Sequence, residues 1–297
     1  MLNIFMGASS AMSLGVGDFM ASQSSERIGA SRALAGMLFV SSVVLTAFLV
    51  ISGKTTDLLN ADNASGLLLG VFHGVSMAFA LVLFFHAMSI GKLTVVAPII
   101  AAHPVFIIAF AFLAGSSLTL LQLVAVAIVL TGVALVGSCA HSDDGNTSET
   151  KKYKPTKQVV GMSLLSSLFY ASAIVALQQA SQTLSDLPVL WLGRTFGFLT
   201  IVLVILCKRQ PLLPPSAKWW PFFLLHGLLD SGGMLFILLG TNGTGDDAIT
   251  AVVASTFPVI TVLLAWIYLK ERMTVAQIFG GVSILAGVAT LIATGSH

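Results

Sequence analysis

The chain has 297 residues, of which 56% are hydrophobic and 9% are charged, and its formal net charge is +2. Soluble domains carry roughly 25% charged residues, so this composition excludes a water-soluble globular protein and makes lipid the expected solvent. The small net charge excludes the strongly basic surface of a nucleic-acid-binding protein. Only two cysteines are present, Cys139 and Cys207, which are too few for a disulfide framework.

Ten apolar segments are long enough to cross a bilayer as helices, which takes about 20 residues each. They predict an all-α integral membrane protein with ten transmembrane helices. In chain order the predicted spans are 3–21, 31–52, 66–87, 92–114, 119–138, 158–178, 187–206, 219–240, 247–269 and 274–294.

One polar segment, HSDDGNTSETKKYKPTK at residues 141–157, separates the first five spans from the last five. Its charges and turn-forming residues predict a solvated linker. The chain is therefore divided into a first five-helix repeat at 1–138, a polar linker at 139–157 and a second five-helix repeat at 158–297.

The two halves resemble each other in sequence, and residues 101–135 align with residues 254–290. Because each half holds five helices, an odd number, equivalent helices must cross the membrane in opposite directions. This predicts an inverted repeat, an arrangement that recurs in transporters with a site between the halves. The matched pairs are Pro104 and Pro258, Thr119 and Thr274, Gln122 and Gln277, Gly132 and Gly287, His73 and His226, and Arg32 and Arg194.

Lysine and arginine residues are distributed unevenly between the connections. The odd-numbered connections hold twelve of them, and the even-numbered connections hold only Lys54. The positive-inside rule then predicts a multi-pass protein of the cell membrane, with the linker at 139–157 in the cytoplasm and both termini outside.

The residues also resemble a known family. The stretches LGVGDFMASQSSERIGASRAL (14–34), APIIAAHP (97–104) and TVLLAWIYLKERMTVAQIFGGVSILAGV (261–288) are similar to the EamA-like branch of the drug/metabolite transporter superfamily. The resemblance covers nearly the whole chain. It implies a basket of ten helices around a central cavity, the fifth and tenth helices packed together, and export or exchange of small metabolites, amino acids or drugs.

The chain departs from the family pattern at one position. The family often has a glutamate after the fourth helix, where this chain has Ser116 and Ser117, and only the second half keeps the acid, as Glu271. The resemblance does not fix a substrate or the orientation.

Six ionisable side chains within the spans are candidate substrate- or proton-binding residues. Ionisable groups are costly in lipid, so they tend to face a cavity or a partner. The candidates are His226, Asp230, His73, Arg194, Asp18 and His103.

His226 and Asp230 are four residues apart on one helix, so they share a face and are expected to form a hydrogen bond. The alternative is a neutral histidine bonded to a nearby backbone carbonyl. His73 is its counterpart in the first half, but Met77 stands where the acid would be. Glycines at i−7, i−3 and i+1 from His73 have the spacing of close helix packing, which favours a packed seam on this face.

Asp18 and Arg194 have competing interpretations. Asp18 is near the predicted end of its helix, where an acid close to the cytoplasmic surface costs little. Arg194 is about two turns into its helix and could bind a substrate carboxylate, or serve as a structural anchor paired with an acid.

Pro104 and Pro258 predict helix kinks, because proline lacks a backbone N–H and frees the carbonyl four residues earlier. His103 is expected to bond to such a freed carbonyl. Kinked helices could be hinges for alternating access, although they are also ordinary in membrane helices.

The favoured hypothesis is a secondary transporter, an exporter of small metabolites such as amino acids or drug-like compounds, with alternating access around a central cavity. No nucleotide-binding motif is present, so an ion gradient or exchange must drive it, and protons are the simplest choice. One alternative is a sugar-phosphate or lipid-precursor carrier of the same superfamily. A histidine-dependent metal or haem protein is less favoured, because no HExxH or related motif occurs.

No metal site, cofactor or enzymatic activity is predicted. The expected partners are a small-molecule substrate, protons and membrane lipids, with no nucleic acid. A monomer or a weak homo-oligomer is expected, because the two joined halves already complete the repeat pair.

Overall fold

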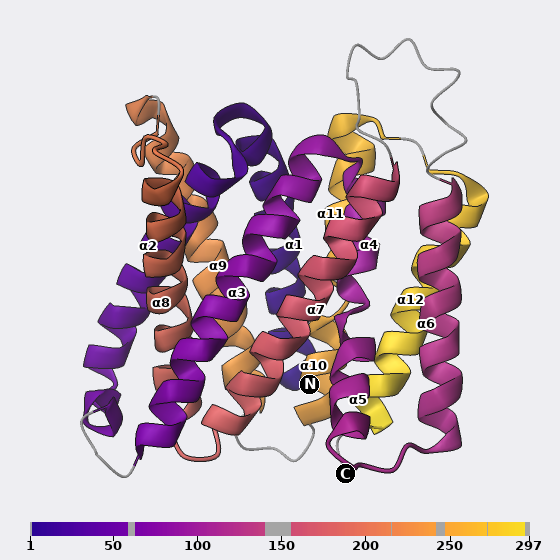
Figure 1. Cartoon of the computed structure of the whole chain (residues 1–297), viewed down its shortest axis with the longest axis horizontal. Coiled ribbons are helices and arrows are strands. Elements are labelled where there is room, and N and C mark those ends of the chain that lie inside the picture. The colour runs from indigo at the N-terminus through magenta and orange to yellow at the C-terminus, as the bar shows by residue number, and fades with distance from the viewer. Residues whose placement is uncertain are drawn as a thin grey trace.

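The computed structural model describes residues 2–58, 63–139, 156–214, 216–241, 247–271 and 273–294, and the regular structure in these ranges is helical throughout. Ten helical spans in them are long and apolar enough to cross a membrane, which confirms the all-α prediction. Most of the predicted linker, and the connection at 242–246, lie outside the described residues. The helices stand side by side and run roughly vertically in the view of Figure 1.

The first half contains five spans, and its fourth span is divided into two helices. The elements are α1 (Leu2–Ile28), α2 (Ala30–Ile51), the short η1 (Lys54–Leu58), α3 (Ala64–Ile90), α4 (Leu93–Ala101) with α5 (His103–Leu113), and α6 (Leu120–Cys139).

The second half repeats this plan, and its fourth span, the ninth of the chain, is also divided. The elements are α7 (Thr156–Ala180), α8 (Asp186–Cys207), the short η3 (Ala217–Trp219) leading into α9 (Trp220–Thr241), α10 (Asp247–Ala254) with α11 (Phe257–Leu264) and the π-helical η4 (Ala265–Leu269), and α12 (Val275–Thr294).

The halves pack crosswise, as an inverted repeat requires. The third span, α3, packs against α7 and α8, and its counterpart α9 packs against α1 and α2. The described helix ends that flank the odd-numbered connections lie at the end of the bundle where Gly29 joins α1 to α2, called here the Gly29 end. The described helix ends that flank the even-numbered connections lie at the opposite end, where Gly115 follows α5, called here the Gly115 end (Figure 1).

The fifth and tenth spans, α6 and α12, pack against each other, as the family resemblance implies. Their contact is made by glycines. A Cβ atom on Gly132 would lie 2.6 Å from the carbonyl oxygen of Gly280, and a Cβ on Gly280 would lie 2.8 Å from that of Gly132. The backbones can approach this closely only because both residues lack a side chain.

The same two helices begin with the same capping motif. The backbone N–H of Thr119 donates to the side-chain oxygen of Gln122 at 3.0 Å, and the Gln122 N–H donates to the Thr119 hydroxyl at 3.2 Å. Thr274 and Gln277 repeat both bonds, at 2.9 and 3.3 Å. This reciprocal arrangement is a capping box, which satisfies backbone donors that a helix leaves free at its start.

The fourth and ninth spans are broken beside their prolines. Pro104 stands in the first turn of α5, and Pro258 in the first turn of α11. Proline removes one helical hydrogen bond and its ring collides with the preceding turn, so each helix ends and a new one begins.

Glu271 joins the two halves at the Gly29 end. Its carboxylate is buried and accepts hydrogen bonds from the backbone N–H groups of Leu93 at 3.2 Å and Thr94 at 3.0 Å. These N–H groups begin α4 and have no acceptor within the helix. The acid that the second half retains therefore caps a helix of the first half.

Replacing Glu271 with alanine should destabilise the protein by about 1–2 kcal/mol, the usual cost of losing a helix cap. Glu271→Gln keeps one acceptor oxygen and should lose less. The thermal unfolding midpoint of the purified protein in detergent measures both effects. An unchanged midpoint for Glu271→Ala would contradict the capping role.

Candidate functional site

A cavity of about 370 Å³ lies between the two halves of the bundle. It is walled by residues of α1, α4, α5 and α7–α12, and its lining runs from the middle of the bundle to Asp186, the first residue of α8 at the Gly115 end. Most of the wall is apolar. Its polar members are His103, Tyr170, Gln178, Asp186 and Ser255, and none of its described lining residues is Lys or Arg.

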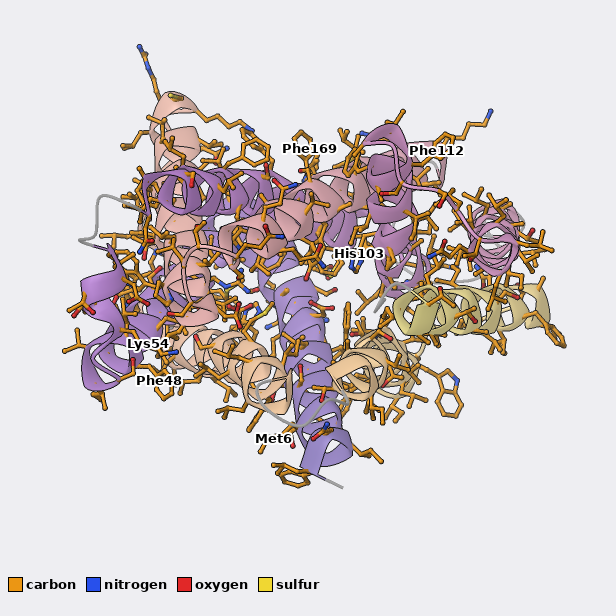
Figure 2. All side chains as sticks on the ribbon, turned by 90° about the horizontal axis from the view of Figure 1, so that it is seen from below. Met6, Phe48, Lys54, His103, Phe112 and Phe169 are labelled. Atoms are coloured by element: carbon orange, nitrogen blue, oxygen red, sulfur yellow. The ribbon has the colours of Figure 1, made fainter. Side chains whose placement is uncertain are left out.

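His103 lies at the break in the fourth span and lines this cavity with Pro104. Its Nδ1 group donates to the carbonyl of Ile100 at 3.2 Å, the carbonyl that Pro104 leaves without its helical partner. The ring stands 4.6 Å from that of Tyr170, centroid to centroid. Figure 2, which looks into the bundle from the Gly115 end, places His103 toward the middle and Met6, Phe48 and Phe112 at the periphery.

Arg194 and Asp230 form a buried ion pair behind the cavity wall. The guanidinium donates from Nε and Nη2 to the two carboxylate oxygens, both at 2.8 Å. The residues are 4% and 8% exposed, so this bidentate contact is shielded from solvent. Arg194 therefore forms the pair with an acid that the sequence analysis gave as one of its two alternatives.

Two serines extend the pair to α2. The Ser41 hydroxyl donates to Asp230 Oδ2 at 2.8 Å, and the Ser231 hydroxyl donates to Ser41 Oγ at 2.8 Å. Asp230 thus connects α8 and α9 of the second half with α2 of the first.

The predicted hydrogen bond between His226 and Asp230 is wrong. Asp230 faces Arg194 because a guanidinium offers two charged donors that match both carboxylate oxygens. Nδ1 of His226 is buried without a hydrogen-bond partner, and the ring stacks on Phe85 at 5.9 Å with an interplanar angle of 11°. A Cβ atom on Gly17 would lie 3.6 Å from His226 Nε2, so α1 passes close to this ring.

His73 lies in a packed seam and not at the cavity. Its Nδ1 group donates to the carbonyl of Ala173 at 2.8 Å. The other edge of the ring fills the space beside Gly193, where a Cβ atom would lie 2.5 Å from Nε2. Gly70 and Gly74 of α3 continue the seam against α8. A Cβ atom on Gly70 would meet the side chain of Leu192, and a Cβ atom on Gly74 would meet the carbonyl oxygen of Gly193.

Asp18 lies in the interior, and the expectation that it is near the surface is wrong. Helix α1 continues to Ile28, ten residues further, which is about 15 Å along the axis. The serine-rich sequence after Asp18 looked like a helix end, but these serines are buried, and the Ser24 hydroxyl bonds back to the Met20 carbonyl at 3.0 Å.

The surroundings of Asp18 connect it to the ion pair. The carboxyl lies beside Thr261 and within electrostatic range of Asp230, and its Oδ2 atom is buried without a hydrogen-bond partner. Both oxygens of the Asp230 carboxylate are thus hydrogen-bonded, whereas Oδ2 of the Asp18 carboxylate is not.

Tyr170 joins this charged group to the cavity, and the sequence analysis missed it. It lines the cavity and lies within electrostatic range of Arg194, Asp18 and Asp230. It is one of only three tyrosines in the chain and stands within an apolar span. A buried tyrosine hydroxyl usually requires a polar partner, which was the available signal.

In the described residues, no three His, Cys, Asp or Glu side chains lie close enough together to hold a metal ion. The predicted residues instead form three groups. His103 lines the cavity, His73 packs in a seam, and Asp18, Arg194, Asp230 and His226 lie in the interior.

Two inverted five-helix repeats with a cavity lined from both of them define the architecture of a membrane transporter. Residues 1–138 and 158–293 match the EamA-like transporter family. The chain belongs to this family, and so to the transporters of the drug/metabolite superfamily.

A solved crystal structure, described only as that of a protein, has the same fold. It is 16% identical, with a TM-score of 0.62, over 100% of this chain and 98% of the other. No curated protein sequence matches the chain significantly.

Removing one partner of the Arg194–Asp230 pair should destabilise the protein by about 3–5 kcal/mol, because a charge is left buried without its counter-ion. Arg194→Ala and Asp230→Ala should therefore each lower the thermal unfolding midpoint. Arg194→Met combined with Asp230→Leu removes both charges and should recover most of the loss. A double variant as unstable as either single variant would contradict the pairing as the source of the effect.

Proposed function

We propose that this protein is a secondary exporter of small zwitterionic or cationic compounds, such as amino acids or drug-like molecules, driven by protons through alternating access. The observation that carries the proposal is the excess carboxylate beside the cavity. Arg194 is the one cation near the two carboxylates of Asp18 and Asp230 in the described interior. Both oxygens of Asp230 bind it, and Oδ2 of Asp18 has no hydrogen-bond partner.

The cavity supports a small substrate. Its volume of about 370 Å³ is within the range of small-molecule sites, about 300–1,000 Å³. Apolar walls with a few polar groups suit an amino acid or an amphipathic drug. Because no described lining residue is Lys or Arg, a sugar-phosphate substrate would lack a cation in the wall, which makes that carrier the second choice.

The charge of the buried group supports coupling to protons. An unpaired carboxylate in a water-poor interior is costly, so Asp18 requires either a proton or a cationic substrate group. The two occupants would compete for one site, and such competition couples their movements in opposite directions. Each charge moved across the membrane is worth about 2.3 kcal/mol per 100 mV, which is enough to drive accumulation.

The two ends of the bundle support alternating access. The cavity extends to the Gly115 end, whereas Glu271 and the packed residues around Phe85 and Phe223 lie on its other side, toward the Gly29 end. The breaks between α4 and α5 and between α10 and α11 provide hinges beside the cavity. With the positive-inside orientation, this arrangement is the outward-facing state of an exporter.

Asp18→Asn should abolish the effect of a pH gradient on transport, because the amide has the same shape but cannot carry the proton. The assay measures uptake of a pool of radiolabelled amino acids into inside-out vesicles, with and without an acidic lumen. Asp57→Asn, which neutralises a carboxylate bonded to Ser185 outside the buried group, is the matched control and should respond like wild type. An acid-stimulated uptake that persists in Asp18→Asn would remove Asp18 from the proton pathway.

The orientation can be tested separately with cysteine labelling of intact cells. Cys207 is exposed at the Gly29 end and Ser116 is exposed at the Gly115 end. A membrane-impermeant maleimide should leave Cys207 unlabelled in a Cys139→Ser background. It should label a Ser116→Cys variant that lacks both native cysteines. The reverse pattern would place the Gly115 end in the cytoplasm and contradict export from the proposed state.

A further inference from the structure

A polar cavity of about 440 Å³ lies at the Gly29 end and shares no lining residue with the cavity between the two halves. It is formed where α1 passes into α2 and where α3 and α8 end. Its polar lining consists of Ser31, Arg32, His86, Lys208 and Gln210, and none of the described residues that line it is acidic. The transporter mechanism above makes no use of this cavity.

Arg32 is held in place with most of its donors unused. Its Nε group donates to the carbonyl of Pro211 at 2.9 Å, which fixes the side chain between α2 and the segment after α8. The other guanidinium N–H groups make no hydrogen bond to the described part of the chain. A guanidinium fork presented in this way matches the oxygens of a phosphate group.

Lys208, the residue that follows α8, provides a second cation in the lining of the cavity. It has no ion pair with a carboxylate in the described residues. A lysine binds phosphate as a point charge, so it can complement the oriented fork of Arg32.

The first turn of α2 adds to these side chains. Gly29, Ala30 and Ser31 line the cavity, and the cap residue Gly29 has no side chain to satisfy the first N–H groups of the helix. The start of a helix also carries a partial positive charge.

The remaining wall of the cavity is apolar and is formed by Ile28, Val82 and Leu83. The cavity therefore joins a basic side to an apolar side, at the level where the spans end and the membrane surface begins. A lipid has a phosphate group next to apolar acyl chains and so matches both sides of the cavity, whereas a soluble phosphate has no apolar part to contact the apolar side.

We propose that this cavity binds the phosphate headgroup of an anionic membrane lipid, with Arg32 and Lys208 as the phosphate ligands and Ile28, Val82 and Leu83 against its glycerol and first acyl carbons. Under the positive-inside orientation this lipid belongs to the cytoplasmic leaflet, which carries the negative surface charge. Because the cavity joins α1, α2 and α3 with α8, a bound lipid holds helices of both halves together at the closed end.

The test is binding of phosphatidylglycerol and phosphatidylcholine to the purified protein in a neutral detergent, followed by native mass spectrometry and by the thermal unfolding midpoint. Wild type should retain phosphatidylglycerol, and its midpoint should rise more with this lipid than with phosphatidylcholine. Arg32→Gln combined with Lys208→Gln should bind phosphatidylglycerol about thirtyfold more weakly, because both phosphate ligands are lost.

Lys218→Gln is the matched control, since it removes a cation at the same end outside the cavity lining and should bind like wild type. Arg32→Lys keeps the charge without the fork and should bind with intermediate strength, which guards against a double variant that fails to fold. Equal binding of phosphatidylglycerol by wild type and the double variant would overturn the proposal. Displacement of the lipid by inorganic phosphate at the same concentration would overturn the lipid assignment in favour of a soluble phosphate.

Discussion

A membrane interior cannot hydrogen-bond to backbone groups, and this constraint determines where the cavity between the two halves can be. A broken helix exposes carbonyl and N–H groups, so it is tolerated at membrane depth only where protein or a cavity surrounds it. At the break before Pro104, the Ile100 carbonyl accepts a bond from His103 and the Ile99 carbonyl accepts one from Ser167 on α7 at 3.1 Å. The break therefore fixes α4 against α7 and places its open side toward the cavity.

At the break in the ninth span, the exposed carbonyl groups are bonded by different residues. The hydroxyl of Ser255 donates to the Val252 carbonyl and that of Thr256 to the Val253 carbonyl, both at 2.7 Å. Here hydroxyl groups of the span itself bond to its carbonyls, whereas the fourth span uses its own His103 ring and a serine of the neighbouring α7. The prolines are duplicated but their partners are not, so a movement at the two hinges breaks different contacts.

The sequence predicted what depends on composition and on spacing within one helix. The ten spans and the inverted repeat have local signatures, such as apolar length or a repeated Thr-x-x-Gln start, whereas the packing of α6 on α12 was implied by the family resemblance. The partner of Asp230 has no such signature. Spacing within α9 pointed to His226, but Arg194 comes from another helix, and only the packing of both α8 and α9 on α2 brings it within reach. Asp18 was misplaced because buried serines have the same composition as a solvated helix end.

The charges of the described chain are separated along the bundle, and this separation restricts what the cavity can carry. Cations line the polar cavity at the Gly29 end, one cation is bound by Asp230 in the interior, and the described wall of the transport cavity holds none. An anion entering that cavity could meet a positive charge only by breaking the Arg194–Asp230 pair, which would leave a buried carboxylate uncompensated. A cationic group reaching Asp18 breaks no bond and supplies the partner that its Oδ2 atom lacks. We therefore propose that the interior selects for positive charge, because Arg194 already binds both oxygens of Asp230 while Oδ2 of Asp18 has no partner.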